Sequence, residues 1–498
     1  MILNVLEIGH ATDESERDFH YGRPGDDEAW DTDDEEPRPK HPFLARFSAT
    51  CQRWRCIAIT RAPHLWTAMI GRYTLSMTDL ALERSRSTQF DLYFGSGIGC
   101  PPPKDVLFFL QRTILNPLAC DRIRSIRVVN GPQNPVNSSA LLCNALMSLK
   151  VIDIACRKPG TVFFTGSSLS CLYPHLTSLS VACAPINPDI FERLHELKSI
   201  FLHRCTFTNT ACITRIFSAA PCIETFSLHI TAFDGNIPII SPDIEHVHAQ
   251  YLKALSLSAP IEIIFSVLQG LGLPLCCSIT MNGTVDHLNE DMKSIQRKLQ
   301  STLGEHLRKT GASFHDCHIM EPSGLPEEFG LRILGTNAVG YPNNFSFSFE
   351  LDIEPLALVT LPDCVLGVFT DFISSVPGLY KDTNYLYVSH PSFYPPSFSA
   401  TVPIENRWQS IYREMTELRT AVISVDELNI SAFLKDTPQC LIELNFHGML
   451  LCQEEYEAVK NRLSCVATSS STRKLTLDNV TLEGTEVEHV TDFFSGQV

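Results

Sequence analysis

One short phrase, apolar-x-x-apolar-x-apolar, recurs six times between residues 123 and 257 of this 498-residue chain. Successive phrases begin 21 to 29 residues apart, and helix-like segments lie in the gaps between them. The alternating apolar pair fits a short strand that points every second side chain into a core. A regular spacing of such strands predicts stacked copies of one structural unit. The six phrases are Ile123, Ile126 and Val128; Leu149, Ile152 and Ile154; Leu176, Leu179 and Val181; Leu197, Ile200 and Leu202; Ile223, Phe226 and Leu228; and Leu252, Leu255 and Leu257.

This phrase and this spacing are typical of leucine-rich repeats, in which each repeat contacts only its neighbours and contributes to one continuous core. We therefore expect a leucine-rich-repeat array over residues 121–260. The period fades over residues 261–405, which we interpret as irregular repeats or insertions, and it returns more loosely in C-terminal repeats over residues 406–498. The looser phrases are Val425, Leu428 and Ile430; Leu441, Leu444 and Phe446; and Thr472, Leu475 and Leu477.

Acidic residues dominate a stretch near the start of the chain. Between Ala11 and His41 there are twelve acidic and four basic residues, interspersed with proline and glycine. A segment of this composition cannot bury enough apolar surface to fold. We expect a disordered acidic insertion at residues 11–42 within a helical module over residues 1–70, followed by a connecting helix and strand over residues 71–120. An apolar stripe over Ile2–Ile8 and one amphipathic helix over Phe43–Ile59 are expected on either side of the insertion.

The expected helix over residues 43–59 carries a specific motif. Phe47, Cys51 and Trp54 share one face of a helix. The run C-Q-R-W-R at residues 51–55, followed by P-H-L-W at residues 63–66, resembles the second half of an F-box. The segment L-E-R-S at residues 82–85 resembles the connection found in large fungal families of F-box-like proteins. The fold class expected is therefore α/β, a leucine-rich-repeat-like solenoid preceded by a small all-α F-box-like module.

The resemblance implies a function. An F-box-like module docks on a Skp-type adaptor and through it on a cullin–RING ubiquitin ligase, while the repeats bind a protein substrate that the sequence does not identify. The protein would then be the substrate-recognition adaptor of an SCF-type ligase. The alternative is a leucine-rich-repeat scaffold or interaction protein with no link to ubiquitin. The residues that the resemblance assigns to adaptor binding are Leu3, Leu6, Phe47, Cys51, Trp54, Ile57, Leu65 and Trp66.

Charge and motif content disfavour several other functions. The net charge of −17 opposes a phosphate backbone, so we expect no nucleic-acid partner. The sequence contains no nucleophile elbow, phosphate-binding loop, dinucleotide fingerprint or H-E-x-x-H zinc motif. The adjacent residues His315, Asp316, Cys317 and His318 are poorly spaced for a tetrahedral metal site, because neighbouring side chains on a strand point to opposite faces. We expect no enzymatic activity, no cofactor and no metal ion.

The cysteine pattern and the hydropathy bear on location. The 18 cysteines are scattered along the chain without a C-x-x-C pair, which favours reduced, buried thiols. An uncharged window over Ile263–Val285 is interrupted by glycine, proline and asparagine, so we expect no membrane span. These features predict a cytoplasmic and/or nuclear protein.

Overall fold

The structure is a computed structural model, and it divides into two compact units, one ending at Phe207 and the other beginning at Thr208. Each unit is described by itself. The predicted acidic insertion at residues 11–42 and the candidate residues Leu3 and Leu6 lie outside the described residues. The described residues are 43–70, 75–94, 117–129, 146–155, 173–230, 240, 246–274, 277–285, 297–298, 300–310, 314–320, 329–336, 346–353, 376, 378–389, 413–424, 440–448, 450–466, 473–482 and 485–494.

The first unit begins with four helical elements, and the helix expected over residues 43–59 is in fact two helices. Cys51 has an extended backbone (φ −156°, ψ 162°), which ends one helix and forms the N-cap of the next. Its Sγ accepts a hydrogen bond from the backbone N–H of Trp54 (3.4 Å). The prediction of a single helix was wrong because cysteine is not among the usual N-cap residues, so nothing in the pattern marked the break. The elements are α2 (Phe43–Thr50), α3 (Gln52–Thr60), η1 (Pro63–Met69) and α4 (Leu75–Arg84).

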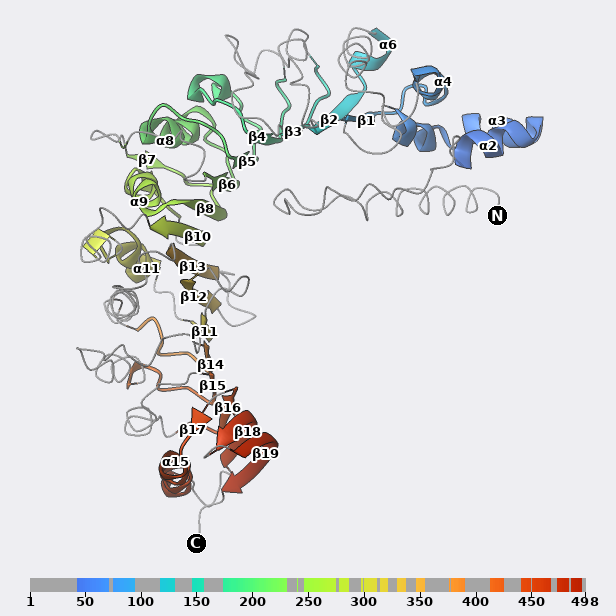
Figure 1. Ribbon diagram of the computed structural model, residues 1–498. Coiled ribbons are helices and arrows are strands. Elements are labelled where there is room, and N and C mark those ends of the chain that lie inside the picture. Colours follow the sequence, from blue (N-terminus) through green and yellow to red (C-terminus); the bar gives the residue numbers. More distant parts are fainter. Residues whose placement is uncertain are drawn as a thin grey trace. The chain divides into compact units, whose positions relative to one another are not determined.

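A parallel sheet follows these helices in the first unit. Its strands are hydrogen-bonded in chain order, each to the next, as expected for repeats that stack on their neighbours (Figure 1). Ile126, Ile152, Leu179 and Ile200 occupy equivalent positions on four successive strands and form one buried row. The strands are β1 (Phe90–Phe94), β2 (Ile123–Val129), β3 (Val151–Ala155), β4 (Ser178–Ala182) and β5 (Ser199–His203), with the short helices α6 (Pro117–Cys120) and η3 (Pro188–Phe191) between them.

The second unit starts with the same arrangement. Phe226, Leu255 and Ile279 lie side by side on three parallel strands, β6 (Thr225–His229), β8 (Ala254–Pro260) and β10 (Ser278–Val285). Figure 1 shows the helices of this unit along one side of its strands. Helix α8 (Thr210–Ala219) precedes β6, and α9 (Ile261–Gln269) connects β8 towards β10. A small separate sheet is formed by β7 (Val247–His248) and β9 (Leu271–Gly272).

Burial confirms the core that the six phrases predict. Every side chain of the eighteen phrase residues that the structure describes is at most 3% exposed. The intervening positions of strands β4, β5, β6 and β8 are partly or fully exposed, as strict alternation requires. The described residues thus form leucine-rich-repeat-like parallel ladders with one buried face. We call the other face, formed by the intervening and exposed strand positions, the open face.

The ladder changes order in the middle of the second unit. From β10 the strands are hydrogen-bonded in the order β10–β13–β12–β11–β14, and β12 runs antiparallel to both of its neighbours. This reversal lies within residues 261–405, where the repeat period fades. The elements are η5 (Gln300–Gly304), α11 (Glu305–Thr310), β11 (Asp316–Met320), β12 (Phe329–Thr336), β13 (Ser346–Ile353) and β14 (Tyr385–Ser389).

Parallel pairing then continues towards the C-terminal end of the unit. Each strand pairs in parallel with the next in the order β14, β15, β16 and β18. The short strand β17 also pairs in parallel with β18, and β19 pairs antiparallel with β18. The phrases ending at Phe446 and Leu477 are confirmed, because their described members are at most 2% exposed. The phrase at Val425, Leu428 and Ile430 lies outside the described residues. The elements are β15 (Thr420–Ser424), β16 (Glu443–His447), β17 (Leu450–Leu451), α15 (Gln453–Val466), β18 (Arg473–Leu482) and β19 (Thr485–Phe494).

A buried tyrosine in this unit gives a test of its core. Tyr380 is 1% exposed and packs edge-on against Phe314, yet its hydroxyl has no hydrogen-bond partner among the described residues. Burial is also the main cause that raises its pKa well above the ordinary value. An unpaired buried hydroxyl costs about 1–3 kcal/mol. We expect Tyr380→Phe to keep or raise the free energy of unfolding measured with urea, whereas Leu386→Ala should lower it by about 2–5 kcal/mol. A clear loss of stability in Tyr380→Phe would contradict this reading of the site.

Candidate functional site

The core of the helical module forms around a tryptophan. Trp66 is fully buried, and its indole N–H donates a hydrogen bond to the backbone oxygen of Ala58 (3.0 Å). The guanidinium of Arg84 lies 4.4 Å from the ring centroid, at cation–π distance. Leu65 beside it is 7% exposed. Trp66 therefore joins α3, η1 and α4 and is not available to a partner in this conformation.

A second aromatic pair lies at the junction between α2 and α3. The rings of Phe47 and Trp54 stack with centroids 4.7 Å apart and an interplanar angle of 7°. Of the two stacked rings Phe47 is buried and Trp54 is partly exposed; Ile57 is also partly exposed, and Cys51 is exposed. The break at Cys51 turns α3 so that Trp54 covers Phe47. Among the described residues of the module, the exposed part of this cluster forms an apolar surface.

Two arginines hold this junction in place. The Nε of Arg55 donates to the backbone oxygen of Ser48 (3.1 Å), near the end of α2. The Nη1 of Arg84 donates to the hydroxyl of Ser48 (3.1 Å). Burial, followed by the charge of Arg55, lowers the pKa of Arg84. Arg84 therefore connects the Ser48 corner to Trp66, which fixes the orientation of α2 relative to η1 and α4.

The end of α4 is tied to the first repeat strands. The hydroxyl of Ser85 donates to the Leu82 oxygen (3.1 Å) and accepts from Nη2 of Arg122 (2.5 Å). Arg122 also donates through Nε to the oxygen of Thr88 (3.0 Å). The L-E-R-S segment of the sequence thus has a structural explanation: Arg84 contacts Ser48 and Trp66 inside the module, and Ser85 links the end of α4 to Arg122, next to β2.

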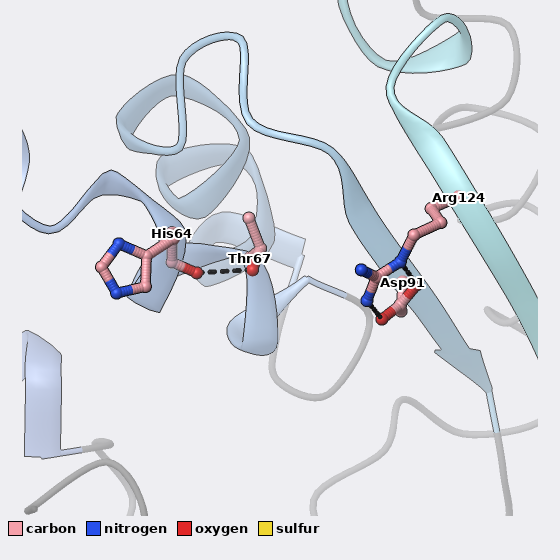
Figure 2. Close-up of polar contacts among 4 residues, drawn as sticks. All are labelled: His64, Thr67, Asp91 and Arg124. Atoms are coloured by element: carbon pink, nitrogen blue, oxygen red, sulfur yellow. Dashed lines mark hydrogen bonds and ion pairs between the residues drawn. The ribbon is translucent and has the colours of Figure 1, made fainter. Parts of the chain in front are cut away.

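Further polar contacts order the same region. Figure 2 shows two of them. The Thr67 hydroxyl donates a hydrogen bond to the backbone oxygen of His64 within η1 (2.5 Å), and the guanidinium of Arg124 on β2 forms an ion pair with the carboxylate of Asp91 on β1. The Nε of Arg124 lies 3.0 Å from Oδ1 of Asp91, and its Nη2 pairs with Oδ2. This hydrogen-bonded pair raises the pKa of Arg124. The contact lies between neighbouring strands at the beginning of the ladder.

The structure sorts the eight predicted adaptor-binding residues into three groups. Leu3 and Leu6 lie outside the described residues. Leu65 and Trp66 belong to the core of the module, and Phe47 supports Trp54 from below. The exposed or partly exposed candidates are Cys51, Trp54 and Ile57.

Sequence reasoning missed a cluster of rings on the open face of the second unit. His318 on β11 lies between Tyr385 and Tyr387 on β14, with ring centroids 5.4 Å and 5.8 Å away. These strands are parallel neighbours, and His318 and Tyr387 are register partners. Burial is the main cause that lowers the pKa of His318 and raises that of Tyr385. Alternation of tyrosine and apolar residues over Tyr385–Ser389 was the signal that could have indicated it.

The run from His315 to His318 follows the alternation of its strand. Cys317 is fully buried, and burial raises the pKa of its thiol to about 12. His315 Nδ1 lies 3.1 Å from Oδ1 of Asp316, and His318 faces the tyrosines. Within the described ranges, no three His, Cys, Asp or Glu side chains are placed to hold a metal ion. No helix in the described part of the chain is long and apolar enough to cross a membrane.

Comparisons with solved structures give distant likenesses. No protein-family model matches the chain, and no curated protein matches it. Among solved structures it is similar to TLR13 in a complex with ssRNA13, at 14% identity and a TM-score of 0.34, over 72% of this chain and 42% of the TLR13 chain. It is also similar to InlP of Listeria monocytogenes, at 12% identity and a TM-score of 0.24, over 60% of this chain and 98% of InlP. The leucine-rich-repeat-like character is therefore defined by the chain's own strand register and burial.

Proposed function

We propose that this protein is the substrate-recognition adaptor of an SCF-type cullin–RING ubiquitin ligase. In this role α2, α3, η1 and α4 form an F-box-like module that docks on a Skp-type adaptor, and the open faces of the repeats bind a protein substrate. The role is recognition rather than catalysis, in the cytoplasm or the nucleus. The coarser part of this proposal, a repeat-based scaffold for protein interactions, follows from the parallel ladders with one buried and one open face.

The observation that carries the proposal is the stacked pair of Phe47 and Trp54. Trp66 already fills the core of the module, so Trp54 is not needed there and keeps a partly exposed ring beside Ile57. Partly exposed tryptophans held rigid by a neighbour are favoured anchors in protein interfaces, because little side-chain entropy is lost on binding. The resemblance of the C-Q-R-W-R and P-H-L-W motifs to an F-box supports the assignment of this pair to adaptor binding.

The repeats supply the other half of the proposed mechanism. A stacked sheet keeps its buried ladder fixed while the exposed residues vary, so it can present a long specific surface. The hydrogen bonds of Arg122 to the Ser85 hydroxyl and the Thr88 oxygen tie the end of α4 to the first strands. A substrate held by the repeats of such an adaptor is kept near the ubiquitin-conjugating enzyme, which raises the effective concentration of its lysines.

The proposal is tested by measuring binding of a purified Skp-type adaptor to the full chain. Truncating an interface tryptophan commonly costs about 2–4 kcal/mol, so Trp54→Ala should weaken the affinity roughly 30- to 1000-fold. Arg53→Ala is the matched control, because Arg53 is an exposed neighbour on the same helix and should change the affinity less than about fivefold. Circular dichroism melts of all three proteins establish that the variants are folded.

Two results would contradict the proposal. If the wild-type chain does not bind the adaptor, the ligase role fails and the scaffold without a ubiquitin link remains. If the wild type binds and Trp54→Ala binds equally well, the adaptor uses a different surface, and the assignment of the Phe47–Trp54 pair is wrong.

A further inference from the structure

The ring cluster on the second unit belongs to a longer row of open-face residues. Because the strands are in register, His318, Tyr387, Val422, Asn445 and Thr476 follow one another across β11, β14, β15, β16 and β18. A parallel row next to it contains Asp316, Tyr385, Thr420, Glu443 and Lys474. Residues from distant parts of the sequence therefore form one continuous surface.

The first property of this surface is its negative charge beside aromatic rings. Asp316 is the register partner of Tyr385, and Glu443 lies two strands further along the same row. The Nζ of Lys474 lies 2.6 Å from Oε1 of Glu443. Asp478 on β18 adds a third carboxylate to the open face of these strands, and its Oδ2 lies 2.9 Å from Nδ1 of His447. Asp316, Glu443 and Asp478 thus outnumber the single ammonium group of Lys474 along the two rows and the next position of β18. The surface is therefore unfavourable for phosphates and favourable for cations.

The second property is a pair of polar atoms left without a partner. The amide oxygen of Asn445 and the hydroxyl oxygen of Thr476 are both buried, and neither has a hydrogen-bond partner among the described residues. Thr476 is only 7% exposed, and the two residues are register partners in the row of Tyr387. Buried polar groups are normally satisfied, so these two atoms point to a ligand that brings its own hydrogen-bonding groups.

We propose that this open face binds a basic segment of the substrate, with an arginine or lysine side chain seated against Tyr385 and Tyr387. Aromatic ring faces attract cations, and the carboxylates of Asp316 and Glu443 add to that attraction. A turn of the Asn445 side chain towards solvent would bring its buried amide oxygen to an N–H of the same segment. The inference rests on the proposed function only in taking the ligand of the repeats to be a protein.

The test uses a fluorescein-labelled Gly/Ser peptide containing the sequence Arg-Ser-Arg, with fluorescence anisotropy on the full chain. Matched peptides replace both arginines with citrulline, which is similar in shape but neutral, or with glutamate. We expect the arginine peptide to bind and the other two to bind more weakly. Asp316→Asn and Tyr387→Leu should each weaken the arginine peptide by about 2- to 30-fold, since each removes one component of the cation site.

The matched control is Glu454→Gln on α15, which removes the same charge from an exposed position on the helix that packs against β18. It should leave the affinity unchanged. If Glu454→Gln weakens binding as much as Asp316→Asn, the attraction comes only from the net charge of the protein, and the inference is overturned. Equal binding of the citrulline or glutamate peptide also overturns it.

Adaptor binding measured on the same samples separates this inference from the proposed function. A chain that binds the Skp-type adaptor and no arginine peptide overturns only the basic-segment site. A chain that binds the arginine peptide through Asp316 and Tyr387 but not the adaptor overturns only the ligase role. In that case the second unit is the binding surface of a scaffold.

Discussion

Replacing Leu179 with aspartate should unfold the sheet of the first unit. Leu179 is fully buried, and its register partners are Ile152 and Ile200 on the strands to either side. The change removes about 1.5–3 kcal/mol of apolar burial and places a carboxylate, costing several kcal/mol more, in a core without a partner. A whole domain is stable by only about 5–15 kcal/mol, so little would remain. Circular dichroism during thermal unfolding of the full chain measures the effect.

The control for this change is Ser178→Asp. Ser178 is the preceding residue of β4 and is partly exposed on the open face. It receives the same new charge in the same strand, but that charge stays in contact with water, so the melting temperature should move by only a few degrees. If Leu179→Asp melts like Ser178→Asp, the buried row of the first unit has been wrongly assigned.

The repeat phrases could be predicted from the sequence because their signal is both local and periodic. A buried position in a parallel ladder needs an apolar side chain of fixed spacing, and Leu252, Leu255 and Leu257 meet this need in the strongest form. The repeat phrase did not mark β14 and β15, because the core there accepts less hydrophobic residues. In β15 the inward positions are Ala421 and Ile423, and ahead of β14 the fully buried Thr383 donates to the Phe314 oxygen (2.9 Å). These residues carry too little hydrophobic signal to stand out.

The reversal of strand order in the second unit could not be predicted from the sequence pattern. The strands β11, β12 and β13 each look like ordinary strands, and only pairing over long sequence distances decides that β13 joins β10 while β11 joins β14. For the same reason the ring cluster was missed. His318 and Tyr387 lie far apart in the chain, and the register of two strands brings their rings to 5.8 Å.

The candidate site of the helical module was only partly predictable. The motif marked Trp54 and Trp66 alike, although the structure gives them different environments. Spacing along an uninterrupted helix could not distinguish them, because the break at Cys51 reorients α3 relative to α2. Burial of Trp66 depends on Ala58 and Arg84, whose approach is a tertiary contact.

The two tryptophans should therefore differ sharply when each is truncated. Trp66→Ala removes a fully buried ring, the hydrogen bond to the Ala58 oxygen and the cation–π contact of Arg84. Truncation of a buried tryptophan costs about 3–5 kcal/mol, so the module should lose most of its stability. Trp54→Ala removes a partly exposed ring whose stack on Phe47 is worth about 0.5–1.5 kcal/mol. Hydrogen exchange of peptides from residues 43–94 reports both effects locally.

A milder variant separates the packing of Trp66 from its hydrogen bond. Trp66→Phe keeps an aromatic ring for Arg84 but leaves the Ala58 oxygen without the indole donor, so the loss should be smaller than in Trp66→Ala, at about 1–3 kcal/mol. If Trp54→Ala accelerates exchange as strongly as Trp66→Ala, then Trp54 is a core residue too. The adaptor would then have to bind a different surface of the module, because an exposed anchor is one whose removal weakens binding while the fold persists.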